Sequence, residues 1–183
     1  MLRSPVAITV AIKAKTEKGI VVLAKERMSV LGKDCKVLEE IKGRDLIGLK
    51  YQPLFDVPPL KSEQSYRVYP ASFVTAEEGT GVVHTSVMYG EDDYLLGKKA
   101  GLPTFHTVGP DGKFIKTLGE GLANHYIKSP KTEELLLNSL RKKGALFAEE
   151  LYQHEYPFCW RCGTPLLYYA RQGWFINMQK GKK

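Results

Sequence analysis

The strongest β-strand pattern in the sequence is Val6-Ala7-Ile8-Thr9-Val10-Ala11-Ile12-Lys13-Ala14, an alternating run rich in β-branched residues. A Lys18-Gly19 turn follows it, and then a second short run, Ile20-Val21-Val22-Leu23-Ala24. Two such runs joined by a glycine-containing turn are typical of a β-hairpin. We therefore predict β-structure in this part of the chain.

Shorter β-like runs recur along the chain between a few helical patterns. The β-like runs are Cys35–Ile41, Tyr66–Tyr69, Ser72–Thr75 and Leu166–Ile176, and the helical patterns are Lys25–Leu31, Gly43–Gly48 and Lys131–Lys143. Gly32 and Gly144 follow the first and last helical patterns, as expected of residues that end helices. Many short strands with few helices predict a mixed, mainly β fold, namely a β-barrel with a few peripheral helices.

Length and composition indicate a folded protein outside the membrane. The chain has 183 residues, enough for one sizeable core, and 43% of them are hydrophobic, which argues against disorder. No apolar run approaches the ~20 residues of a membrane span, and the start, Met1–Pro5, is too short and too polar for a secretory signal. We therefore expect a cytoplasmic protein with no membrane partner.

The sequence is basic, with 27 Lys and Arg against 20 Asp and Glu, a net charge of +7. This charge is compatible with a polyanionic partner such as RNA, and equally with a small basic protein that binds nothing anionic. The clusters Lys98-Lys99 and Arg141-Lys142-Lys143 have the same two interpretations, contact with an RNA backbone or a solvated helix face.

Three cysteines are present, Cys35, Cys159 and Cys162, and an odd number with one close pair does not indicate a disulfide framework. Cys159-Trp160-Arg161-Cys162 has the spacing of one zinc knuckle, in which two thiolates reach a single tetrahedral metal. Such a pair is half of a zinc site or a redox pair. Nothing in the sequence places Cys35 or His154 beside it.

The segments with the most candidate functional residues are Gly79-Thr80-Gly81-Val82-Val83-His84 and, after it, Gly90-Glu91-Asp92-Asp93-Tyr94. The glycines let the backbone approach a ligand closely, and a strand through Val82 and Val83 would place His84 at its end. Asp92 and Asp93 precede a predicted helix over Tyr94–Ala100, so one of them is a candidate N-cap. The functional alternative is a carboxylate that projects into a pocket and binds an ammonium group. By pattern alone, a lone histidine such as His84 is more often structural than catalytic.

These two segments resemble the editing insertion of isoleucyl-tRNA synthetases. So do four further stretches, Gly97–Pro103, Val108–Gly112, Tyr156–Pro165 and Gln172–Ile176. The resemblance runs from about Val6 onward, and the related valyl and leucyl enzymes share the Gly-Thr-Gly turn but differ at the His and around the two Asp residues. It implies an editing domain over residues 1–155 and a returning connector over residues 156–183 that carries the half zinc knuckle.

The function that the resemblance implies is hydrolysis of mischarged valyl-tRNA(Ile), the second sieve of aminoacylation fidelity. A synthetic site rejects valine, which is one methylene smaller than isoleucine, by only roughly 1–3 kcal/mol, so a second, smaller pocket admits valine and cuts the ester. The catalytic residues are then His84, which lines the pocket, and Asp93, which holds the α-ammonium. Gly79, Thr80, Gly81 and Asp92 complete the substrate-binding set with Asp93. A placed water attacks the ester with help from a ribose hydroxyl.

The partners that the resemblance implies are the 3′ end of tRNA(Ile) carrying valine and the remainder of the synthetase. Editing needs no cofactor, and zinc at Cys159 and Cys162 would occupy an incomplete site. ATP and Mg²⁺ belong to the parent enzyme, since this sequence has neither a P-loop nor a Gly-x-Gly-x-x-Gly motif after a strand.

The sequence departs from the family at its start. The family has a threonine-rich segment that lines the editing pocket just before the strand matching Val6–Ala11, whereas Met1-Leu2-Arg3-Ser4-Pro5 stands there in this sequence. We therefore expect weak deacylation by this chain alone. The alternative function is a catalytically incomplete tRNA-binding or structural fragment of the same synthetase.

Overall fold

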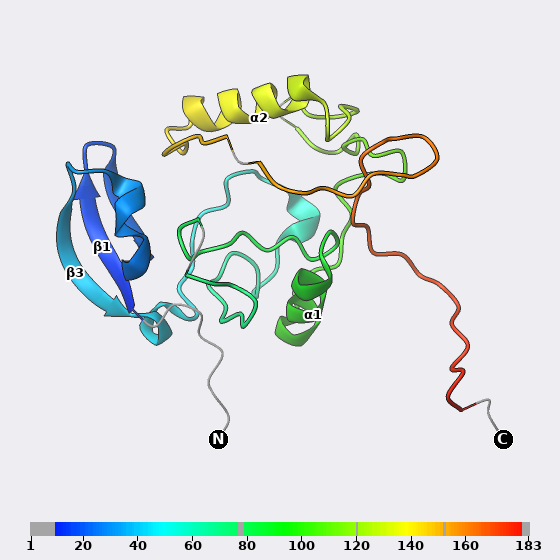
Figure 1. Ribbon diagram of the computed structural model, residues 1–183, viewed down its shortest axis with the longest axis horizontal. Coiled ribbons are helices and arrows are strands. Elements are labelled where there is room, and N and C mark those ends of the chain that lie inside the picture. The colour runs from blue at the N-terminus through cyan, green and yellow to red at the C-terminus, as the bar shows by residue number, and fades with distance from the viewer. Residues whose placement is uncertain (1–9, 77–78, 120, 152, 181–183) are drawn as a thin grey trace.

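The fold combines a small antiparallel sheet with two α-helices and long irregular segments (Figure 1). The computed structural model describes residues 10–76, 79–119, 121–151 and 153–180. In chain order, the elements are β1 (Val10–Thr16), β2 (Gly19–Ala24), the 3₁₀-helix η1 (Lys25–Leu31), β3 (Lys36–Lys42), the 3₁₀-helices η2 (Gly43–Leu46) and η3 (Pro58–Leu60), α1 (Glu91–Ala100) and α2 (Pro130–Lys142).

The sheet has the strand order β2-β1-β3, and both pairings are antiparallel. Ile12 lies opposite Leu23, and Ala14 lies opposite Val21. Because side chains alternate between the two faces of a strand, these four residues share one face, and η1 brings Leu31 onto the same cluster. Ile12 is only 1% exposed and is the largest apolar side chain buried to that degree among the described residues.

The predicted hairpin is confirmed by the β1–β2 pairing. Gly19 turns the chain with φ of +128°, a value that favours glycine, and the Thr16 hydroxyl donates to its carbonyl oxygen at 2.9 Å. The predicted strand over Cys35–Ile41 is confirmed as β3 with a one-residue shift. The predicted helix over Lys25–Leu31 forms as a 3₁₀-helix, and residues 6–9 of the first predicted strand lie outside the described residues.

The prediction of a β-barrel is wrong for the part of the chain that the structure describes. The sheet has three strands and is open, with β2 and β3 at its two edges. The later β-like runs do not extend it: Arg67 pairs only with Lys50, and Phe158 only with Pro165, as isolated bridges. Residues 72–75 and 166–176 form no strand. In the second stretch the Leu166 and Ala170 N–H groups donate to Pro157 and Met88, which are single partners and not a continuous ladder.

Helix α1 begins at Glu91, three residues before the predicted Tyr94, and its N-cap is Gly90. The prediction that Asp92 or Asp93 caps the helix is therefore wrong. Both instead lie in the first turn with Glu91, where carboxylates complement the positive end of the helix dipole. The predicted helix over Lys131–Lys143 is confirmed as α2.

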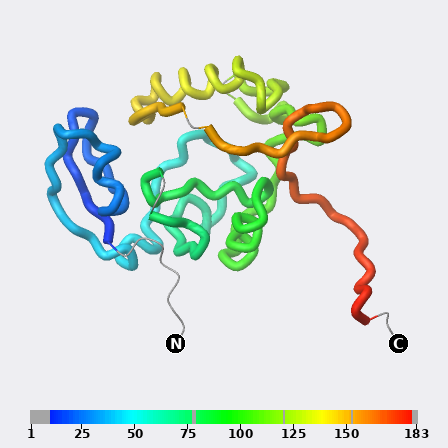
Figure 2. The backbone as a smooth tube through the Cα atoms, viewed as in Figure 1, coloured from blue at the N-terminus to red at the C-terminus, as the bar shows by residue number. Residues whose placement is uncertain are grey.

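Figures 1 and 2 show how these elements are arranged: the sheet lies at one side of the molecule, and α1 and α2 lie on opposite sides of the irregular central segments. The last described residues run away from the body as an extended stretch. Neither described α-helix combines the length and the apolar character that crossing a lipid bilayer requires.

Candidate functional site

The Gly79-Thr80-Gly81 loop is held against the small sheet by two hydrogen bonds. The Ala24 backbone N–H at the end of β2 donates to the Thr80 carbonyl oxygen at 2.9 Å. The Arg27 Nε–H on η1 donates to the Gly79 carbonyl oxygen at 2.8 Å. Gly79 and Gly81 have φ of +58° and +74°, so side chains would strain the loop at both positions. The hairpin and η1 therefore position this loop.

His84 lies on an irregular segment instead of at the end of a strand. Residues 82–86 have no strand assignment, and Val82 and Val83 are 52% and 56% exposed, so the predicted strand through them is wrong. At its start, the Thr80 hydroxyl accepts the Val82 N–H at 3.3 Å. The His84 side chain is exposed to solvent, where a ligand can reach it.

Asp93 is the least satisfied carboxylate among the described residues. Its Oδ1 has no contact with solvent and no hydrogen-bond partner within the described residues. Its Oδ2 would lie 2.9 Å from a Cβ atom at position 90, so glycine at that position leaves the room that this carboxylate occupies. A shielded carboxylate oxygen without a partner costs about 1–3 kcal/mol or more. A cationic ligand at Oδ1 would remove that cost.

Of the other predicted substrate-binding residues, Asp92 lies in the same helix as Asp93, whereas Gly79, Thr80 and Gly81 lie on the loop that is bonded to Ala24 and Arg27. Asp92 is exposed in the same helical turn. The Tyr89 N–H donates to the Ser86 carbonyl oxygen at 2.9 Å, so a single turn leads from the His84 segment to the start of α1. Within the described residues, His84 and Asp93 form no hydrogen bond or ion pair with each other. Any joint action of the two requires a substrate that spans them.

An aromatic cluster beside α1 was not predicted from the sequence. The His106 ring stacks on Tyr169, with ring centroids 4.1 Å apart and planes 10° from parallel, and Tyr89 meets both rings edge-on. The Tyr89 hydroxyl accepts the Val108 N–H at 2.8 Å, and the Tyr169 hydroxyl donates to the Val108 carbonyl oxygen at 3.1 Å. These contacts tie the C-terminal segment to the residues that precede α1. No periodic pattern in the sequence marks them.

The basic clusters are partly engaged within the protein. Arg141 donates to Glu149 at 2.6 Å and to Asn138 at 2.9 Å. Lys143 donates to the Leu54 carbonyl oxygen at 2.7 Å and lies 4.5 Å from the centroid of the Phe55 ring. Arg141 therefore links α2 to the segment that follows it, and Lys143 holds the end of α2 to the chain around residue 54, which supports a structural role for both.

Cys159 and Cys162 lie in a tight hairpin. The Cys159 N–H donates to the Thr164 carbonyl oxygen, and the Gly163 N–H donates to the Cys159 carbonyl oxygen, both at 2.8 Å. The hydrogen bond with the Thr164 hydroxyl, 3.0 Å from Cys162 Sγ, lowers the pKa of the Cys162 thiol below its ordinary value, and Cys159 adds to this effect. A thiolate-favouring hairpin suits a metal ligand or a redox pair.

The donor set fits half of a zinc site. In the described part of the chain, no third His, Cys, Asp or Glu joins the two cysteines in a group that could hold a metal ion. Cys35 lies elsewhere, with its thiol 3.6 Å from the Gly32 carbonyl oxygen. A structural zinc ion takes four ligands, so two of them would have to come from outside this group.

Replacing Arg27 by methionine is expected to lower the free energy of unfolding by about 1 kcal/mol. Methionine keeps most of the aliphatic length but cannot donate to the Gly79 carbonyl oxygen. Urea unfolding measures the change, and amide exchange at Ala24 shows whether its bond to Thr80 weakens as well. Arg44→Met is the matched control, because the Arg44 side chain is 70% exposed and its ion pair with the neighbouring Asp45 is long, at 3.7 Å. Equal losses in the two variants would contradict the positioning role of Arg27.

Comparison with known proteins adds a family context to this geometry. No family model matches the chain. It is 39% identical over 170 residues to an isoleucine–tRNA ligase of Clostridium tetani, a match that covers 91% of this chain and 16% of that protein. It is 40% identical over 167 residues to an isoleucine–tRNA ligase of Bacillus thuringiensis (strain Al Hakam), with the same coverages. An isoleucine–tRNA ligase 2 of Bacillus anthracis is 39% identical over 167 residues, again covering 91% and 16%. The chain therefore corresponds in sequence to a segment of isoleucine–tRNA ligases, about 16% of their length.

Proposed function

We propose that this chain is the editing segment of an isoleucine–tRNA ligase and hydrolyses the ester of valine mischarged to tRNA(Ile). The observation that carries the proposal is the shielded Asp93 Oδ1, a carboxylate oxygen without a hydrogen-bond partner among the described residues. An aminoacyl ester presents an α-ammonium group close to the bond that is cut. The similarity to isoleucine–tRNA ligases supplies the class of substrate.

In the proposed mechanism Asp93 binds the α-ammonium and so fixes the ester next to the start of α1. The Gly79-Thr80-Gly81 loop, held by Ala24 and Arg27, offers backbone without Cβ atoms at two positions, which allows close approach of the terminal nucleotide. Water adds to the ester carbonyl, and the ribose oxygen leaves with a proton, which yields free valine and uncharged tRNA. A ribose hydroxyl next to the ester is well placed to assist this proton transfer.

Selectivity in this proposal comes from exclusion of the larger side chain. Isoleucine exceeds valine by one methylene, and a pocket that fits valine rejects that extra group by steric clash. His84 lies on the segment between the glycine loop and α1 and is exposed, so we assign it to the wall of the pocket. The net charge of +7 favours binding of the tRNA polyanion. ATP and Mg²⁺ take part in aminoacylation by the parent ligase, and the ester hydrolysis proposed here uses neither.

The test is single-turnover deacylation of preformed valyl-tRNA(Ile) and isoleucyl-tRNA(Ile), with the chain in excess so that slow hydrolysis is measurable above the spontaneous rate. We expect the chain to hydrolyse the valyl ester faster than its spontaneous rate. We also expect the valyl ester to be hydrolysed about tenfold or more faster than the isoleucyl ester. The no-protein reaction and heat-unfolded chain are the controls. Spontaneous rates for both esters in the presence of folded chain would contradict the proposal.

A further inference from the structure

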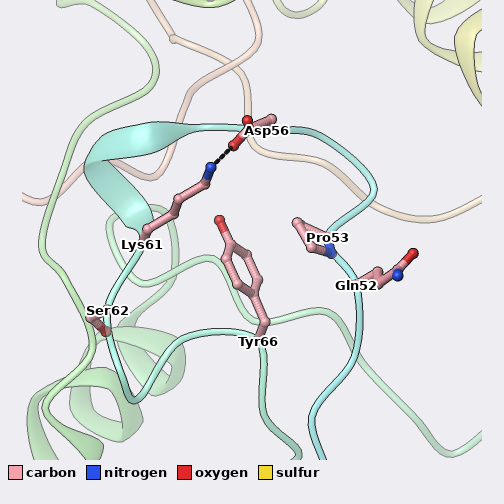
Figure 3. A pocket seen from close by; sticks show the side chains of 6 residues that line it. All are labelled: Gln52, Pro53, Asp56, Lys61, Ser62 and Tyr66. Atoms are coloured by element: carbon pink, nitrogen blue, oxygen red, sulfur yellow. Dashed lines mark ion pairs between the residues drawn. The ribbon is translucent and has the colours of Figure 1, made fainter.

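Far from Asp93 in the sequence, the chain has a hollow of about 550 Å³ around Tyr66 (Figure 3). Six residues line it: Gln52, Pro53, Asp56, Lys61, Ser62 and Tyr66. The hollow follows the single bridge between Lys50 and Arg67, which brings the residues on either side of this loop together. The hollow is shallow and broadly open to solvent.

Tyr66 is unusual in both its backbone conformation and the environment of its hydroxyl group. Its φ is +57°, a left-handed conformation that bulky L-residues rarely adopt. Its hydroxyl oxygen is shielded from solvent and has no hydrogen-bond partner among the described residues. Residues with a strained backbone cluster at ligand-binding sites, and a buried polar atom without a hydrogen-bond partner indicates that a ligand can supply that partner. Both features belong to a residue that lines the hollow.

The hydroxyl of Tyr66 points toward an ion pair on the opposite wall, between Lys61 and Asp56 (Figure 3). Lys61 Nζ and Asp56 Oδ1 are 2.7 Å apart, and their side chains are 53% and 66% exposed. The hydrogen bond to Asp56 raises the pKa of Lys61 above its ordinary value, which favours the charged ammonium. An exposed pair of this kind is weakly held, which lets a ligand insert between it and Tyr66.

The wall therefore presents a hydrogen-bond donor with a positive charge, Lys61, and an acceptor with a negative charge, Asp56. The Tyr66 hydroxyl beside them can donate or accept, and the charges of Lys61 and Asp56 cancel. This set complements the edge of a nucleobase, which carries amino or imino donors next to ring or carbonyl acceptors. The Tyr51 ring is 47% exposed and packs edge-on against Tyr66, with ring centroids 6.1 Å apart. Such a ring offers a surface on which a neighbouring base can stack.

We propose that this hollow binds the base of an unpaired nucleotide in an RNA chain, with the base edge between the Tyr66 hydroxyl and the Lys61–Asp56 pair. The choice of RNA rests on the proposed function, in which the substrate is a tRNA. The neutral wall favours a base over a phosphate group, because Asp56 would repel an anion. Lys50, next to Tyr51 in the chain, is exposed and can meet the adjoining backbone phosphate.

Binding of uncharged RNA tetranucleotides tests the proposal, with fluorescence anisotropy of end-labelled A4, C4, G4 and U4 and a self-complementary duplex as the probes. We expect at least one single-stranded probe to bind, and Tyr66→Phe, which removes only the hydroxyl, to weaken it by about five- to tenfold. Asp56→Asn is expected to change the order of preference among the four bases. Tyr168→Phe is the matched control, because Tyr168 is 65% exposed and lines no part of the hollow, and it should change affinity less than about twofold.

The proposal is overturned if Tyr66→Phe and Asp56→Asn both bind every tetranucleotide as the wild type does. Equal affinity for the duplex, or displacement of the bound probe by free valine or a short peptide, overturns it as well. Asp56→Asn keeps the test decisive if Tyr66→Phe does not fold, since the Asp56 side chain is exposed. These probes carry no amino acid, so binding that depends on Tyr66 can stand without deacylation, and deacylation can stand without it.

Discussion

Replacing Gly97 by alanine is expected to lower the free energy of unfolding by about 1–3 kcal/mol, because the new methyl group has no room. Gly97 lies inside α1 and is buried. A Cβ atom there would lie 2.6 and 2.7 Å from the two γ-methyl groups of Val87 and 3.2 Å from its Cβ. In an open helix, the same change would stabilise by about 0.5–1 kcal/mol, so the sign of the effect reports the clash.

A second substitution, at Val87, is expected to relieve this clash. Val87→Ala removes both methyl groups, and we expect the double variant Gly97→Ala/Val87→Ala to be more stable than the sum of the two single changes implies, by about 1 kcal/mol or more. Urea unfolding of the four proteins gives this coupling energy. Gly119→Ala is the control, since no atom of the described residues beyond its chain neighbours lies within 4 Å of the added atom there. A Gly97→Ala variant as stable as Gly119→Ala would show that α1 does not pack on Val87 in this way.

The contact of α1 with Val87 also bears on the proposed site. Asp93 lies one helical turn before Gly97, and the segment from Ser86 to Tyr89 that carries Val87 leads from His84 to the helix. A shift of α1 away from Val87 would move the Asp93 carboxylate relative to that segment. We therefore attribute part of the geometry of the site to a packing constraint that only glycine at position 97 satisfies.

Local pattern was enough to predict the hairpin, β3 and α2. The alternation around Ile12 and Ala14 places their side chains on one face, and a sheet with one covered face follows from that period of two. Local pattern could not predict whether the sheet closes into a barrel, because closure requires hydrogen bonding between strands that lie far apart in the sequence. Pairings such as Lys50 with Arg67 remain single bridges, and no local pattern distinguishes a single bridge from a ladder.

In the candidate site, too, some features could be predicted from the sequence and others depend on tertiary packing. Gly79 and Gly81 were predicted from residue type, as glycines that let the backbone approach a ligand, whereas the role of Asp93 came from the resemblance to isoleucyl-tRNA synthetases. The structure adds the unpartnered Asp93 oxygen as an observation that supports a ligand there. Arg27 was missed, because its bond to Gly79 joins residues 52 positions apart. Tyr66 was missed as well, since a left-handed φ and a shielded hydroxyl arise from tertiary packing and leave no trace in residue order.

Replacing Asp93 by asparagine is expected to reduce the hydrolysis of valyl-tRNA(Ile) by this chain to about the spontaneous rate, while stability changes by less than about 1 kcal/mol. Asparagine keeps the shape of the side chain but has no charge with which to bind an ammonium group. Two effects on stability oppose each other: the loss of a shielded, unpartnered carboxylate stabilises the fold, and the loss of a negative charge in the first turn of α1 destabilises it.

The matched control for Asp93→Asn is Glu91→Gln, in the same helical turn, because Glu91 carries the same charge at the same end of the dipole, is exposed and is not among the predicted substrate-binding residues. Single-turnover deacylation and urea unfolding are measured on both variants. Equal losses of activity would assign the effect to the overall charge of the first turn. A large loss confined to Asp93→Asn, with the fold intact, requires direct contact between that carboxylate and the substrate. A loss of stability in step with activity would instead make Asp93 a structural residue, since a group that binds substrate need not stabilise the empty fold.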